Sequence, residues 1–159
     1  MDKIKVVVRK ILIVLLIAWM ILVFCLSNQN GPESSNLSRK VANFFANGDT
    51  VRAEKIEPVV RKAAHMSEYG VGAMIFYGIT MTYTGMSRKK KIITSFVFVI
   101  LYASSDELHQ LFINERNGSV KDVIIDTCGS ALGILAMFIV ERAMITIDNK
   151  VQENLKNQK

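Results

Sequence analysis

The chain has 159 residues, of which 50% are hydrophobic and 21% are charged, and its formal net charge is +6. The apolar share is high for a soluble domain, and the apolar residues collect in four blocks near the ~20 residues that cross a bilayer as a helix. The two cysteines argue against a disulfide-stapled scaffold or a multi-cysteine zinc fold. Basic residues lie at the ends of the apolar blocks rather than along one polar face, which argues against nucleic-acid binding.

The first apolar block, residues 11–27, follows a basic tail at residues 1–10. A basic stretch before a short apolar core is typical of a signal peptide as well as of a first transmembrane helix. The small-x-small cleavage site is present only as the weak Cys25-Leu26-Ser27, and the bulky Phe24 before Cys25 does not fit a lipoprotein signal. We therefore expect this block to be a retained first span.

The segment after the first span contains an amphipathic pattern. Leu37, Val41, Phe44 and Phe45 are spaced i, i+4, i+7 and i+8, as on one face of a helix. We expect this helix to lie on the outer membrane interface or to cap the bundle. Pro58 suits the first turn of the helix that becomes the second span.

Three further spans are expected, at residues 59–83, 92–112 and 120–140. The short loop at residues 88–91 is entirely basic, and such loops are retained in the cytoplasm. This orientation puts 12 of the 20 Lys and Arg residues inside, but only 4 of the 14 Asp and Glu residues. The predicted fold is an all-α, four-helix membrane bundle over residues 11–140. Both termini are cytoplasmic, residues 141–159 form a solvated tail, and the amphipathic helix lies in the first outer loop.

Ionisable residues, which are costly in lipid, gather near the outer ends of three spans. They are His65 and Glu68; Asp106, Glu107 and His109 with Gln110; and Asp122 and Asp126, with Arg116 in the outer turn. Spacings of three and four residues place each set on one helical face. At 1.5 Å per residue, two of the carboxylates lie ~9 Å below the outer boundary of a ~30 Å layer. These groups should therefore face one another or a wet cavity.

Small residues share a face with this acidic stripe on the fourth span. Gly129 and Gly133 are spaced i, i+4 in line with Asp126. Such a pair allows a neighbouring helix backbone to approach closely. We therefore expect this face to point into the bundle.

Two interpretations of the ionisable cluster stay open. In the first, Arg116 bridges carboxylates with its planar guanidinium, and the ion-pair network locks the outer turn. In the second, the cluster forms a functional pocket open to the outer face. We favour the second, because a buried ion pair adds little net stability and the cluster has more groups than register-fixing requires.

Several stretches resemble motifs of VanZ-like membrane proteins. Residues 27–38 resemble S-x-Q-x-G-x-x-S-x-x-x-S, residues 61–69 (RKAAHMSEY) resemble R-K-x-x-H-x-x-E-Y, and residues 105–110 (SDELHQ) resemble S-D-E-x-H-Q. Residues 116–126 supply elements similar to R-x-G-S and D-x-x-x-[ND]. The similarity covers about residues 24–135 in the expected order. It departs at Asp126, where the family pattern has asparagine at least as often.

The resemblance implies a multi-pass protein of the bacterial cytoplasmic membrane, associated with low-level resistance to teicoplanin-type glycopeptides. It carries over a site of unknown chemistry at His65, Glu68, Asp106, Glu107, His109, Gln110, Arg116 and Asp122. To this ligand-binding set we add Asp126 for its position on the fourth span. Membrane lipids are expected partners.

Three functional hypotheses follow. The protein binds or masks a lipid-linked or peptidyl cell-envelope component, which alters glycopeptide access. Alternatively, it is an intramembrane enzyme, with His65, Glu68, Asp106, Glu107, His109 and Asp122 as candidate acid/base groups or ligands of a divalent metal. The spacing matches no known metal signature, so we expect no resident cofactor. Proton-coupled transport is the third hypothesis, but four spans without an internal repeat argue against it.

Overall fold

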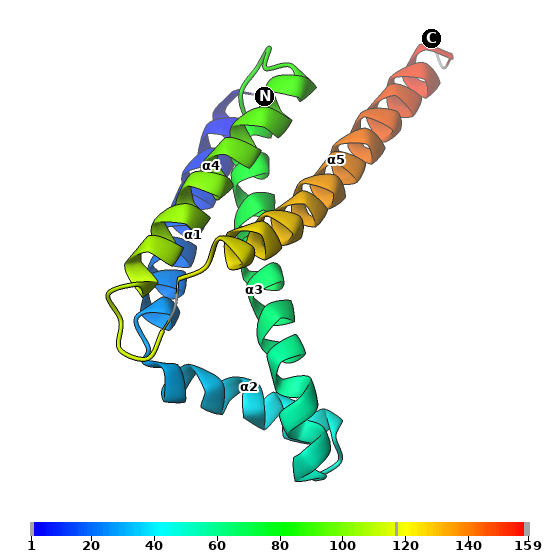
Figure 1. Cartoon of the computed structure of the whole chain (residues 1–159). Coiled ribbons are helices and arrows are strands. Elements are labelled where there is room, and N and C mark those ends of the chain that lie inside the picture. The colour runs from blue at the N-terminus through cyan, green and yellow to red at the C-terminus, as the bar shows by residue number, and fades with distance from the viewer. Residues whose placement is uncertain (1, 117, 158–159) are drawn as a thin grey trace.

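The computed structural model describes residues 2–116 and 118–157 of the chain. Asn117, in the predicted outer turn, and the last two residues of the predicted C-terminal tail lie outside the described residues. Five helices make up the described fold (Figure 1): α1 (Asp2–Ser27), α2 (Gly31–Phe45), α3 (Thr50–Met81), α4 (Arg88–Gln110) and α5 (Val120–Asn157). The protein is therefore all-α.

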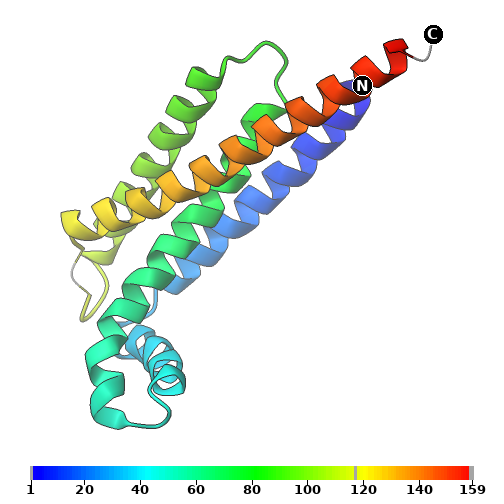
Figure 2. The same ribbon diagram turned by 90° about the vertical axis from the view of Figure 1, so that its right-hand side faces the viewer.

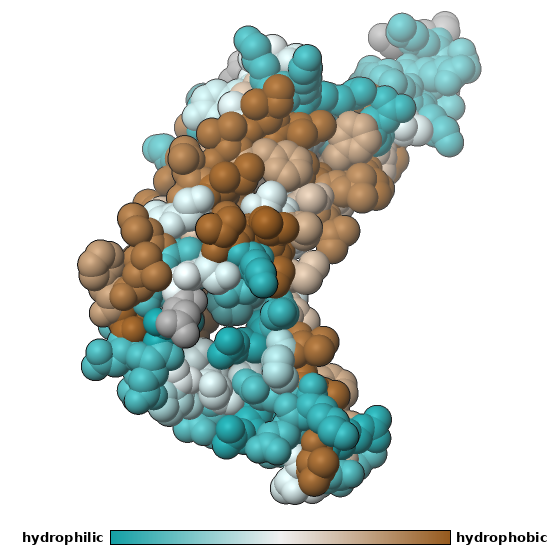
Figure 3. Space-filling view, in the orientation of Figure 1, coloured by the Kyte–Doolittle hydropathy of each residue, from teal (hydrophilic) through white to brown (hydrophobic). Residues whose placement is uncertain are grey.

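Three of the described helices, α1, α4 and α5, are long and apolar enough to cross a membrane. Large apolar side chains are exposed on all three, for example Val14, Leu101 and Leu132 at 65%, 64% and 60% exposure. Figure 3 shows this as a hydrophobic belt over the body of the molecule, with hydrophilic surface at the α2 end and along the end of α5. Water would oppose so much contiguous apolar surface, whereas lipid accepts it. The protein is therefore a multi-pass membrane protein.

The second predicted span lies within α3, which is not among the three apolar helices. Polar residues such as His65 and Glu68 lower its hydropathy. However, α3 contacts each of the other four helices. A helix shielded in this way needs less apolar surface of its own, and its crossing of the membrane stays a prediction.

The helices leave two distinct ends on the bundle. Figures 1 and 2 place the N-terminus, the α3–α4 connection and the end of α5 together at one end. α2 and the α4–α5 connection lie at the other end, and α5 crosses α3 obliquely between them. Residues 88–91 and both termini thus share one end, as the predicted orientation requires. Which side of a membrane each end faces stays a prediction.

The core lies where α1, α3 and α4 meet. The ring of Trp19 is 6% exposed and packs edge-on against Tyr69, with 5.9 Å between the ring centroids. Its Nε1 donates to the backbone oxygen of Glu68 at 2.9 Å. From α4, the Tyr102 hydroxyl donates to the backbone oxygen of Met20 at 2.7 Å. Two aromatic side chains therefore fasten α1 to its neighbours, Trp19 to the backbone of α3 and Tyr102 from α4 to the backbone of α1.

α3 and α5 cross at very close range, and this confirms the prediction for the glycine pair. A Cβ at Gly129 would overlap the backbone oxygen of Met66, and one at Gly133 would overlap that of Gly70. At the same crossing the Ser130 hydroxyl is hydrogen-bonded to the backbone of its own helix. The close crossing brings the polar end of α3 against the beginning of α5.

The prediction for Pro58 is wrong. α3 begins at Thr50, where Asp49 accepts a hydrogen bond from the backbone N–H of Arg52, so Pro58 lies inside the helix. The early start is stabilised by packing on α2. Ala53 and Ile56 before the proline and Val60 after it join a small apolar cluster with Ala42 of α2 and Ala46 at its C-terminal cap, and this contact favours helix on both sides of the proline.

α5 runs unbroken to Asn157, well beyond the predicted end of the fourth span at residue 140. Glu141, predicted to begin the solvated tail, is buried at 6% exposure. Its carboxylate pairs with Lys91 at 2.5 Å and accepts a hydrogen bond from the Tyr77 hydroxyl at 2.6 Å. This buried ion pair ties α3, α4 and α5 together at the end of the bundle opposite α2.

Candidate functional site

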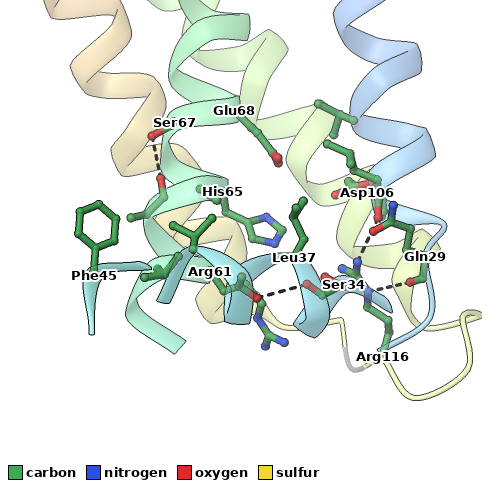
Figure 4. Close-up of a pocket in the computed structure, with 18 residues that line it drawn as sticks. Gln29, Ser34, Leu37, Phe45, Arg61, His65, Ser67, Glu68, Asp106 and Arg116 are labelled. Carbon is green, nitrogen blue, oxygen red and sulfur yellow. Dashed lines mark hydrogen bonds between the residues drawn. The ribbon is translucent and has the colours of Figure 1, made fainter. Parts of the chain in front are cut away.

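A cavity of 470 Å³ opens between α1, α2 and α3 near the α2 end of the bundle. One wall is apolar, formed by Val23 and Leu26 of α1 and by Leu37, Val41 and Phe45 of α2. Polar side chains from the other helices complete the lining (Figure 4): Arg61, His65 and Glu68 of α3, Asp106 of α4 and Arg116 of the α4–α5 connection. The cavity therefore has an apolar side and a charged side.

A second, smaller pocket of 140 Å³ adjoins it, and the two share Arg61, His65 and Arg116 as lining residues. Its other lining residues are Gly31, Lys62, Glu107, Gln110, Glu115, Asp122, Ile125 and Asp126. Most of these side chains are polar or charged. The two spaces thus lie side by side, and the larger is lined mainly by apolar groups whereas the smaller is lined mainly by polar ones.

Asp126 is completely buried, and it lies against His65 across the α3–α5 crossing. Its Oδ1 is 3.8 Å from Nδ1 of His65, which is too long for a hydrogen bond. Neither oxygen of Asp126 has a hydrogen-bond partner among the described residues. The close crossing therefore places a carboxylate and an imidazole side by side without satisfying them.

Asp106 is the most fully hydrogen-bonded acid of the site. The Tyr69 hydroxyl and the Gln110 side-chain nitrogen both donate to its Oδ2 at 3.1 Å. Tyr69 is completely buried, so Asp106 is held from α3 as well as from its own helix. These contacts fix the carboxylate at the edge of the larger cavity.

Glu107 links α4 to the beginning of α5. Its Oε2 accepts a hydrogen bond from the backbone N–H of Ser119 at 2.7 Å, whereas its Oε1 is buried without a partner among the described residues. Asp122, one turn further into α5, lines the same small pocket. The pocket therefore holds a second carboxylate with a free buried oxygen.

Arg116 ties the α4–α5 connection to the end of α1. Its Nε and Nη2 donate to the backbone oxygens of Gln29 and Leu26, each at 3.1 Å. Among the described residues it forms no ion pair, so the predicted bridge between carboxylates is absent. Burial, followed by the charge of Arg61, lowers the pKa of its guanidinium, which nevertheless stays protonated at neutral pH.

Three of the predicted site residues, Glu68, Asp106 and His109, do not line the small pocket. His109 stacks on Phe24 of α1, with 4.9 Å between the ring centroids, and lines neither cavity. Glu68 and Asp106 line only the larger cavity. The remaining predicted residues lie around the small pocket. Their functional roles stay predictions.

The described residues contain no group of three or more His, Cys, Asp or Glu side chains arranged to hold a metal ion. The metal-dependent form of the enzyme hypothesis therefore gains no support from this geometry, whereas its acid/base form keeps the His65 and Asp126 pair.

Sequence reasoning missed several residues that build the site. Tyr69, which holds Asp106, comes four residues after His65 and within the quoted R-K-x-x-H-x-x-E-Y stretch, so its position was a usable signal. Arg61 and Lys62 lie in the same stretch and line the small pocket. The α2 residues of the cavity wall, Leu37, Val41 and Phe45, belong to the amphipathic pattern visible in the sequence, but their place against α1 and α3 had no signal, because it depends on how α2 folds back.

The fold and the buried polar site define a class: a multi-pass helical membrane protein with an amphipathic cavity at one end of its bundle. A family model described as VanZ/LLP1 matches residues 12–141, which include every residue of the predicted site. The chain therefore belongs to the VanZ/LLP1 family. No curated protein and no solved structure matches the chain.

Proposed function

We propose that the protein binds an amphipathic component of the cell envelope, with the α2 end of the bundle at the outer face of the cytoplasmic membrane. The observation that carries this proposal is the pair of adjacent cavities that share Arg61, His65 and Arg116. An apolar wall from α1 and α2 faces polar groups, some of which also line the small pocket. The larger cavity, at 470 Å³, has the size of a small-molecule site. An apolar chain suits its wall, and a polar headgroup suits the pocket.

The proposed orientation rests on charge. Residues 88–91 are all basic and lie at the end of the bundle opposite α2. Residues 88–91, predicted as a loop, form the first turn of α4 in the structure. Basic residues beside a span stay in the cytoplasm in either case, so α3 crosses the membrane as a fourth span and the site opens outwards. The family resemblance adds that the membrane is the bacterial cytoplasmic membrane. A protein that holds an envelope component at this face would alter glycopeptide access to its target.

Binding is tested by filling the cavity. Ala64 lines the larger cavity from α3, so Ala64→Trp should displace the apolar part of a bound molecule. Leu101→Trp, on the exposed face of α4, is the matched control. Native mass spectrometry of protein purified in mild detergent should find a retained amphipathic molecule on the wild type and the control, but not on Ala64→Trp. A wild type that retains no such molecule contradicts the proposal.

The role in resistance is tested in cells that lack the protein. Wild type should restore the teicoplanin susceptibility and envelope composition of the parent strain. Asp106→Asn should not, because it removes the charge at the edge of the cavity. Asp148→Asn, on the exposed end of α5, is a matched change that should behave as wild type. Identical susceptibility and composition in the deletion, Asp106→Asn and wild-type strains would argue against this role.

An intramembrane acid/base enzyme is the second candidate, and one observation favours it. His65 and Asp126 lie 3.8 Å apart in the small pocket, next to a free oxygen of Glu107. Such a pair can hold and move a proton on a bound substrate. Incubation of the purified protein with an envelope lipid extract, followed by mass spectrometry, tests this. Loss of a lipid with wild type but not with His65→Gln supports catalysis, and an unchanged extract contradicts it.

A further inference from the structure

We infer that the small pocket binds a primary ammonium group that the ligand carries beside a phosphate, so that the preferred headgroup is a zwitterionic aminophosphate. This inference rests on the proposed function, because it names the headgroup of the amphipathic ligand. It follows from the unsatisfied acceptors in the pocket, the distribution of its charges and the residues that the two cavities share.

The small pocket contains acceptors that lack donors. Both oxygens of Asp126 and the Oε1 of Glu107 are buried without a hydrogen-bond partner among the described residues. Asp126 is 0% exposed and Glu107 is 5% exposed, and both line the pocket. Buried polar atoms without partners are rare, because each costs its full desolvation. A primary ammonium supplies three N–H donors and a compensating charge.

The buried charges of the pocket are the carboxylates of Glu107 and Asp126, whereas Arg61, Lys62 and Glu115 are exposed and Arg116 and Asp122 are half-buried. The pocket is lined by four acids and three bases: Glu107, Glu115, Asp122 and Asp126, with Arg61, Lys62 and Arg116. A ligand that matches this arrangement places its cation inside and its anion at the rim. Phosphate suits the rim, because a guanidinium binds its oxygens in a planar fork.

Residues shared by the two cavities decide where the phosphate lies. Arg61 and Arg116 line both spaces. A phosphate between them can direct a short ammonium arm into the pocket and an apolar chain along the wall formed by α1 and α2. The pocket of 140 Å³ has the volume of about four to five waters. An aminoethyl arm fits this space, whereas a peptide or an oligosaccharide does not.

Lipids that differ only in their headgroup test the inference. Purified protein is titrated in detergent with phosphatidylethanolamine, phosphatidylcholine or phosphatidylglycerol of identical acyl chains, and retained lipid is measured by native mass spectrometry. Phosphatidylcholine keeps the positive charge but has no N–H donor, and phosphatidylglycerol has no cation. We expect phosphatidylethanolamine to bind at least about tenfold more tightly than either of the other two lipids. Equal binding of all three lipids would overturn the inference.

Two variants connect this preference to the pocket. Asp126→Asn should remove the preference for the ethanolamine lipid without weakening the binding of phosphatidylglycerol, and Glu107→Gln should reduce it in the same direction. Glu141→Gln, a matched change at the opposite end of the bundle, should keep the preference. A preference unchanged in both pocket variants would also overturn the inference. Asn and Gln keep the size of the side chains that they replace, so we expect both variants to fold. Retained binding of phosphatidylglycerol checks this for each variant.

Soluble phosphoethanolamine distinguishes the two sources of this chemistry. If it binds as tightly as the lipid, the ligand is a free aminophosphate; if it binds at least about tenfold more weakly, the ligand is a lipid. Failure of this inference differs from failure of the proposed function. Lipid that is displaced by Ala64→Trp but shows no headgroup preference leaves the proposed function intact. A wild type that binds no lipid removes both.

Discussion

Gly129→Ala tests the close crossing of α3 and α5. The added methyl group would overlap the backbone oxygen of Met66 and crowd its Cα and carbonyl carbon. Backbone atoms inside a helix cannot rotate away as a side chain can, so the two helices must separate. Such overpacking costs about 1–3 kcal/mol, and a backbone contact belongs at the upper end. Alanine returns about 1 kcal/mol of helix propensity, which leaves a net loss of about 2 kcal/mol.

Gly78→Ala is the matched control, because its new methyl group would lie 3.4 Å from Leu12, an ordinary contact. It should be neutral or stabilise the protein by up to about 1 kcal/mol. The free energies of unfolding are compared in detergent by circular dichroism during denaturation. Lipid retention is a second readout, since separating α3 from α5 also moves His65 away from Asp126. Equal stability of Gly129→Ala and Gly78→Ala would refute the reasoning.

Three further predictions concern the buried charges and the topology. Asp126→Asn should raise the free energy of unfolding of lipid-free protein by about 1 kcal/mol or more, because the buried carboxylate lacks hydrogen-bond donors. Thermal unfolding in detergent measures this, and an unchanged stability of the variant would contradict it. Lys91→Met leaves Glu141 with only a tyrosine hydroxyl and should cost about 3–5 kcal/mol. Replacing both partners by Met should cost clearly less in the same assay, and an equal loss would speak against a buried pair. In a variant with both native cysteines replaced by serine, a membrane-impermeant maleimide should label Asn36→Cys but not Thr84→Cys on intact cells. The reverse labelling would invert the proposed orientation.

Much of the helical arrangement is predictable because lipid imposes simple demands. A long apolar block without charges indicates a membrane span. Carboxylates such as those of Asp106 and Asp126 are costly in lipid, so they are expected to face polar groups inside the bundle. Gly129 and Gly133 identify the face of α5 that another backbone approaches, and the crossing confirms this. These inferences need only helical spacing and the cost of polar groups in lipid.

The rest depends on contacts that sequence spacing does not encode. Arg116 donates to the backbone oxygens of Leu26, in the last turn of α1, and Gln29, just after it, and any residue type offers such oxygens. The early start of α3 depends on the Asp49 cap and on packing against α2, which outweigh the usual preference for Pro58 in a first turn. Glu141 is buried because it pairs with Lys91, which lies in the first turn of α4 and is distant in the chain. For Arg116 and Glu141 the deciding partner is far away in the chain.

The attachments of α1 determine the shape of a cavity that Arg9, Trp19 and Tyr102 do not line themselves. Lipid is as apolar as the protein interior, so burying the apolar surface of α1 against protein gives no hydrophobic stabilisation. Apolar contact alone therefore fixes neither the depth of α1 in the membrane nor its rotation about its axis. Those are set by directional bonds: Trp19 to the backbone of α3, Tyr102 to the backbone at Met20, and Arg9 to Thr82 at 2.9 Å. Val23, which lines the larger cavity, belongs to the same helix and moves with it. Replacing one lipid-facing aliphatic residue of α1 by another should therefore leave the apolar cavity wall in place. Trp19→Phe removes the hydrogen bond to the backbone of α3, so α1 could rotate and the shape of the cavity would change.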